Sequence, residues 1–129
     1  MISPAKKGAF HILLVEDEPV IRELVKSMLS DGEVDVECAE NGAEGLRLAK
    51  TKQFQLILLD VVLPQMDGIT LCRLIKGDAA LAPVPVYMLT AKAKRADVET
   101  ATRAGANGYI HKPFRGAELM DLVARLRAG

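Results

Sequence analysis

The chain has 129 residues, of which 50% are hydrophobic and 26% are charged. This size and composition indicate one globular domain with a real core, and exclude a disordered chain or two domains. The 17 basic and 17 acidic residues cancel, so no net charge attracts nucleic acid or an anionic membrane. We therefore expect no direct contact with nucleic acid and none with a membrane.

Residues 1–9 read as a short polar tail, and the domain is expected to cover residues 10–128. The tail has no apolar segment, and no later apolar run approaches membrane-spanning length. Cys38 and Cys72 form no CxxC pair, so we interpret them as small core residues rather than a disulfide. The expected location is the cytoplasm.

The first elements alternate between strand and helix. Residues 11–15 form a continuous apolar run typical of a strand covered on both faces, and residues 56–59 repeat it. Between them, apolar residues at helical spacing over 21–29 predict an amphipathic helix that ends near Asp31. This order favours parallel strands joined by helices.

A second strand and helix lie between these runs. Residues 34–38 alternate apolar residues with acids, which predicts a less buried strand near a sheet edge. Asn41 is the expected cap of a helix that continues to about Lys50.

The second half continues the alternation. Helices are predicted over residues 67–76 and 119–126, and strands over 84–89 and 108–110, with Pro85 near the start of its strand. Asp67-Gly68 is interpreted as a turn and helix cap. The helix over residues 95–104 has mostly small apolar residues, so it has little to bury and is expected to be mobile. Five strand and helix pairs indicate an α/β domain with a parallel sheet.

Ligands of a parallel sheet bind beyond the carboxyl ends of its strands. Polar side chains stand at these ends: Glu16, Asp17 and Glu18, then Asp60, Thr90 and Lys112. At a separation of about 5 Å, each pair of carboxylates repels by roughly 3 kcal/mol at an effective dielectric near 20. This cost predicts a hard cation such as Mg²⁺, with Lys112 as a second positive group.

The turn after the first strand reads EDEP, which excludes several α/β families. It lacks the glycine-rich turn of a dinucleotide fold, the P-loop motif and the phosphate loop of a flavin site. No Ser-His-Asp set with a nucleophile elbow is present.

Four motifs together resemble the receiver domain of bacterial two-component response regulators, the family that includes the chemotaxis regulators. They are VEDEP at 15–19, LLDVVLPQMDG at 58–68, MLTA at 88–91 and AGANGYIHKPF at 104–114, within a match from about Phe10 to Arg127. The resemblance implies a doubly wound (βα)5 three-layer sandwich of flavodoxin-like type. Its five parallel strands would have the order 2-1-3-4-5.

The resemblance also implies a function. Asp60 would accept a phosphoryl group from a histidine kinase or a histidine phosphotransfer protein, in a reaction that needs Mg²⁺. Asp17 would bind the metal directly and Glu16 directly or through water, together with Asp60 and the backbone carbonyl of Val62. Self-phosphorylation and self-dephosphorylation would be the only chemistry, so the chain would be a signalling switch and not an enzyme.

Further residues would complete the switch. Lys112 would face the phosphate, and Pro113 would follow a cis peptide bond. Thr90 would donate its hydroxyl to the phosphate, and Tyr109 would change rotamer in response. The helix after Thr90, the last strand and the last helix would form the output surface toward a downstream protein or output domain.

Some positions depart from common family choices. Glu16 stands where an Asp is most frequent, while Val62 and Lys92 flank the path of attacking water, so the phosphate lifetime is not inherited from relatives. The kinase, the stimulus, the downstream partner and the dimer state stay open, as does whether the chain is a stand-alone regulator or part of a longer protein.

Two other functions stay open beside this one. A phosphorylation-independent interaction module could retain the fold, whereas a Mg²⁺-dependent phosphohydrolase is disfavoured because its DxD motif needs an Asp at Val62. Individually, Asp60 could cap a helix, Thr90 could be a strand-end hydroxyl and Tyr109 an edge aromatic. His111 is interpreted as structural or exposed.

Overall fold

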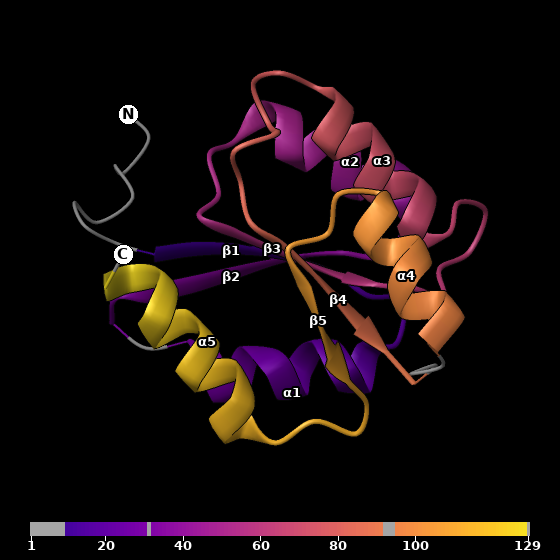
Figure 1. The fold of residues 1–129 in the computed structure, drawn as a ribbon. Helices are drawn as coiled ribbons and strands as arrows, with labels where there is room; N and C mark the ends of the chain where they lie inside the picture. The colour runs from indigo at the N-terminus through magenta and orange to yellow at the C-terminus, as the bar shows by residue number, and fades with distance from the viewer. Residues whose placement is uncertain (1–9, 31, 92–94, 129) are drawn as a thin grey trace.

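The computed structural model describes residues 10–30, 32–91 and 95–128. The predicted tail over 1–9, the helix end at Asp31 and the cation Lys92 lie outside these ranges. Strands and helices alternate along the described chain (Figure 1). Their bounds are β1 Phe10–Val15, α1 Pro19–Leu29, β2 Val34–Ala39, α2 Gly42–Thr51, β3 Leu56–Asp60, α3 Gly68–Gly77, β4 Val86–Thr90, α4 Arg95–Arg103, β5 Gly108–His111 and α5 Gly116–Ala128.

The five strands form one parallel sheet of order β2-β1-β3-β4-β5, which confirms the predicted order. In the register, Leu14 of β1 pairs with Cys38 of β2 on one side and with Leu58 of β3 on the other. Strand β3 is buried along its whole length, whereas β2 has exposed and half-buried positions. The alternating acids of β2 thus correctly predicted an edge strand.

Helices cover both faces of the sheet, as Figure 1 shows, with α1 and α5 on one side and α2, α3 and α4 on the other. Successive side chains of a strand point to opposite faces, so Leu13 joins the core under α2 and α3, and Leu14 joins the core under α1 and α5. This is the predicted doubly wound three-layer sandwich.

The predicted helix caps are present. The Asn41 side chain accepts a hydrogen bond from the Glu44 N–H at 2.8 Å, and Asp67 accepts one from the Thr70 N–H at 2.7 Å. Strand β4 differs from the prediction because it begins at Val86 instead of residue 84. Pro85 has no N–H to donate, so it precedes the strand.

Helix α4 and the residue after it pack through small side chains, since Ala101 and Ala104 lie in the core. The Cys72 thiol donates to the Ala104 carbonyl at 3.6 Å. Its predicted mobility stays a prediction. None of the helices in the described ranges is long and apolar enough to cross a membrane.

Candidate functional site

Polar burial in the described chain is confined to the carboxyl ends of the strands. The buried polar or charged side chains there are those of Glu16, Asp60 and Thr90. Glu16 follows β1, Asp60 is the last residue of β3 and Thr90 is the last residue of β4. Parallel pairing places these ends at the same edge of the sheet, because Asp60 pairs with Leu89, the neighbour of Thr90. The polar side chains predicted to lie together therefore meet at this edge of the sheet.

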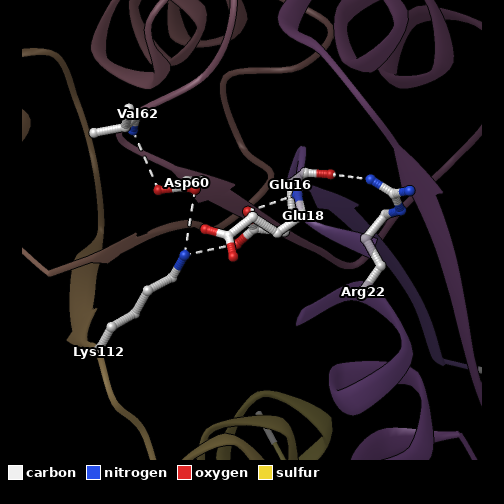
Figure 2. Close-up of polar contacts among 6 residues, drawn as sticks. All are labelled: Glu16, Glu18, Arg22, Asp60, Val62 and Lys112. Atoms are coloured by element: carbon white, nitrogen blue, oxygen red, sulfur yellow. Dashed lines mark hydrogen bonds and ion pairs between the residues drawn. The ribbon is translucent and has the colours of Figure 1, made fainter. Parts of the chain in front are cut away.

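Lys112 contacts both buried carboxylates. Its Nζ donates to Glu16 Oε1 at 2.7 Å and to Asp60 Oδ2 at 3.2 Å, as Figure 2 shows. The backbone holds Lys112 in place, since its N–H donates to the Thr90 carbonyl at 2.7 Å just beyond β5. The peptide bond between Lys112 and Pro113 is cis, as predicted. One ammonium thus neutralises part of the charge of a buried pair of carboxylates.

The ionisation of these groups reflects burial and mutual contact. Burial raises the pKa of Glu16 from 4.5 to about 7, against the hydrogen bond from Lys112, which lowers it. Burial alone would lower the pKa of Lys112, but its hydrogen bonds to Glu16 and Asp60 and their charges raise it overall. Lys112 is therefore a cation at neutral pH, whereas Glu16 titrates near it.

The backbone around Asp60 holds its carboxylate at the strand end. The Val62 N–H donates to Asp60 Oδ1 at 3.2 Å, and the Gly68 N–H donates to the Val61 carbonyl at 2.9 Å. A Cβ atom at Gly68 would lie 2.1 Å from the Asp60 carbonyl oxygen. Only a glycine allows the start of α3 to approach the end of β3 this closely.

Three carboxylates follow β1 and could hold a metal ion. Oxygens of Glu16, Asp17 and Glu18 all lie within 4.8 Å of one another, with Glu16 buried and the other two exposed. Carboxylate oxygens are ligands that Mg²⁺ accepts, so the donors fit the predicted ion. This cluster contains Glu18, which was not predicted as a ligand. Asp60 is not part of it, but its carboxylate shares the Lys112 ammonium with Glu16 and helps to raise the pKa of Glu16.

Two other predicted site residues lie apart from this contact. The Val62 side chain is 59% exposed beside Asp60, and the ligand role of its carbonyl stays a prediction. Tyr109 is 42% exposed on β5, where it borders a groove of about 610 Å³ along α5. The switch roles of Thr90 and Tyr109 likewise stay predictions.

Sequence reasoning missed Arg22 and the close approach at Gly68. Arg22 Nη1 donates to the Glu16 backbone carbonyl at 2.9 Å. Arg22 lies in the first turn of α1, just after the acidic turn formed by residues 16–18. This position was a usable signal, because a cation there can reach back to the acidic turn. The tight contact of Gly68 had no such signal in the sequence, where Gly68 also suits the predicted turn.

Comparison with known proteins agrees with this geometry. The family model described as "Response regulator receiver domain" matches residues 12–124. The transcriptional regulatory protein CseB of Streptomyces coelicolor is 42% identical over 118 residues, covering 92% of this chain and 48% of CseB. The chain spans about half the length of the curated relatives it matches.

Several solved structures resemble this chain in both fold and sequence. A receiver domain of a signal transduction histidine kinase from Syntrophus aciditrophicus matches with a TM-score of 0.86 and 37% identity, covering 94% of this chain and 92% of that domain. The receiver domain of sensor histidine kinase PA1611 from Pseudomonas aeruginosa matches with a TM-score of 0.85 and 35% identity, covering 94% of this chain and 99% of that domain. That structure has a magnesium ion in its active-site cleft. The chain therefore belongs to the response regulator receiver domain family, the phosphorylation-dependent switches of two-component signalling.

Proposed function

We propose that Asp60 accepts a phosphoryl group from the phosphohistidine of a histidine kinase or phosphotransfer protein. The observation that carries this proposal is a buried carboxylate at a strand end with an ammonium 3.2 Å away, Lys112 Nζ to Asp60 Oδ2. A cap would not need a buried carboxylate paired with a cation. We assign residues 10–128 to this one domain and leave residues 1–9 outside it.

The transfer follows the chemistry of a carboxylate nucleophile. An Asp60 oxygen attacks phosphorus, a P–O bond forms, and the P–N bond breaks with its electron pair passing to the donor histidine. Lys112 offsets negative charge on the phosphoryl oxygens, the main demand of phosphoryl transfer. The apolar residues of β3 keep the Asp60 carboxylate from moving.

Magnesium is the metal that the donor set and a relative support. Glu16, Asp17, Asp60 and the Val62 carbonyl would hold it, with exposed Glu18 close enough to contribute. The PA1611 receiver domain holds a magnesium ion in its active-site cleft. When bound, the ion supplies positive charge against the phosphoryl oxygens.

The phosphoryl group then changes the surface of the domain. Thr90, buried at the same edge as Asp60, donates its hydroxyl to the phosphate, and exposed Tyr109 changes rotamer. The face made by α4, β5 and α5 contacts a downstream protein or output domain. The relative MtrA is named a DNA-binding response regulator, but this chain matches only about half of its length. We assign the domain described here no direct contact with nucleic acid.

Intact-mass spectrometry tests the proposal. The protein is incubated with acetyl phosphate, with and without Mg²⁺, as wild type, Asp60→Asn and Asp67→Asn. We expect one phosphoryl adduct that needs Mg²⁺, is lost in Asp60→Asn and is retained in Asp67→Asn, because Asn preserves the cap at residue 67. Lys112→Met should slow the reaction by about 10²-fold to 10³-fold.

The alternative makes the opposite prediction. If the wild type gains no adduct while a known receiver domain is modified under the same conditions, the chain is a phosphorylation-independent interaction module. An adduct that persists in Asp60→Asn would place the acceptor elsewhere.

A further inference from the structure

Arg22 contacts the acidic turn from the helix that follows it. Its backbone N–H donates to the Glu18 carbonyl at 3.1 Å, and its Nη1 donates to the Glu16 carbonyl at 2.9 Å. Asp17 lies between these two acceptors in the sequence. One residue therefore holds the backbone on both sides of Asp17, the residue proposed to bind the metal directly.

The guanidinium is held in this position. The Arg22 side chain is only 15% exposed, and its Nη2 lies 3.5 Å from Glu40 Oε1 in the turn after β2. Figure 2 shows the side chain directed toward the Glu16 backbone, away from the carboxylate that Lys112 contacts. Arg22 thus touches the frame of the acidic turn and not the metal-binding oxygens.

The charge of Arg22 has an effect opposite to its hydrogen bond. A cation this close to the acidic cluster repels a divalent ion, so charge alone would make metal binding weaker in the wild type. Its hydrogen bond to the Glu16 carbonyl restricts the turn, which lowers the entropic cost of ordering the ligands when the ion binds. The two effects predict opposite results for removal of the side chain.

We propose that Arg22 is the positioning residue of the metal site: its hydrogen bond to the Glu16 carbonyl orders the turn that presents Asp17 and Glu16 to Mg²⁺. This inference rests on the proposed function, since it assigns a role toward the same ion. It places Arg22 outside the group of residues that touch the phosphoryl group.

The test compares Arg22→Met with Arg22→Lys. Met keeps the aliphatic stem and packing but removes the donors and the charge, whereas Lys keeps one donor and the charge. Isothermal titration calorimetry gives the Mg²⁺ dissociation constant, and acetyl phosphate labelling gives the rate at limiting and saturating Mg²⁺. Arg47→Ala, which removes an equal charge from an exposed position of α2, is the matched control.

We expect Arg22→Met to weaken Mg²⁺ binding about tenfold, as loss of a group that orients metal ligands does. Labelling should slow at limiting Mg²⁺ and return to the wild-type rate at saturation. Arg22→Lys should retain most of the affinity, and Glu40→Gln should stay within about twofold because the Glu40 side chain is 70% exposed and lies 3.5 Å from the guanidinium. Arg47→Ala should leave the dissociation constant unchanged.

A second readout needs no metal. In metal-free buffer, amide hydrogen exchange at Glu18 and Arg22 should be faster in Arg22→Met than in the wild type, with α5 amides unchanged. Thermal unfolding by circular dichroism shows whether each variant is folded. If Arg22→Met does not fold, Arg22→Gln, which is uncharged and two bonds shorter than Arg, takes its place in the same Mg²⁺ titration, with the same weakening expected.

Several outcomes would overturn the inference. Tighter Mg²⁺ binding in Arg22→Met would show that the main effect of Arg22 is to repel the ion. If Arg22→Lys lost as much Mg²⁺ affinity as Arg22→Met, the hydrogen bond to the Glu16 carbonyl would not be the cause. Failure of the wild type itself to bind Mg²⁺ or to be labelled would reject the proposed function instead. The wild-type measurement therefore separates the two failures.

Discussion

The two ends of the same sheet differ in what they bury. At the carboxyl end, Glu16 and Asp60 are buried with Lys112 between them. At the amino end, Phe10 and Phe54 border a groove of about 600 Å³ lined mostly by apolar residues. Buried charge lowers stability unless it is partnered, and here two carboxylates share one ammonium. The carboxyl end therefore carries a cost in stability that the apolar amino end does not.

The largest expected effect is at the amino end. Phe54→Ala should lower the free energy of unfolding by about 3 kcal/mol, the lower end of the range for truncating a buried Phe, because Phe54 is 8% exposed beside the groove. Urea unfolding measures the loss. Acetyl phosphate labelling and Mg²⁺ affinity should not change while the protein is folded. A slower labelling rate would show that the two ends are coupled.

The carboxyl end should make stability depend on pH. Glu16 has a pKa of about 7 in the folded protein against 4.5 as its ordinary value, so the folded state binds more protons between these values. The free energy of unfolding in metal-free buffer should therefore fall as pH rises from 4.5 to 7. At about 1.4 kcal/mol per pH unit, the Glu16 part of this fall is on the order of 3 kcal/mol.

Urea unfolding of wild type and Glu16→Gln between pH 4.5 and 8 isolates this part. The wild type should lose stability relative to Glu16→Gln across the interval, since Gln does not titrate. Parallel curves would mean that the Lys112 contact keeps Glu16 ionised in the folded protein.

Two glycines of α3 allow a comparison between the site, where Gly68 lies, and an open surface, where Gly77 lies. Gly68→Ala should cost about 1 to 3 kcal/mol, because its Cβ would meet the Asp60 carbonyl oxygen at 2.1 Å and the backbone cannot yield freely. Gly77→Ala meets nothing within 4 Å and should be neutral or slightly stabilising. Thermal unfolding measures both, and equal effects would remove any special role for Gly68. Labelling should slow only in Gly68→Ala.

The smallest expected effect of a change at the site is a gain in stability. Asp60→Asn should raise the free energy of unfolding by about 1 kcal/mol in metal-free buffer, because one ammonium then faces one buried carboxylate instead of two. Thermal unfolding with a chelator present measures it. Saturating Mg²⁺ should reverse the order by stabilising only the wild type. A lower melting temperature without metal would show that Lys112 outweighs the repulsion.

Local sequence patterns predicted much of the fold and the polar residues at the strand ends. The apolar run over 56–59 and the alternating acids of 34–38 correctly separated a central strand from an edge strand. The helix caps at Asn41 and Asp67 needed only local chemistry, which is why they were predictable. The start of β4 was less predictable, because Pro85 allows either boundary.

The sequence by itself determined which strand ends carry charge, since Asp60 and Lys112 follow apolar runs whatever the packing. Only the tertiary structure decided that one Lys112 ammonium serves both Glu16 and Asp60, 96 and 52 residues away along the chain. It also decided that Arg22 holds the Glu16 carbonyl and that Gly68 touches Asp60. These contacts depend on distances between separate elements, and such distances follow from how the helices pack on the sheet and not from any local pattern.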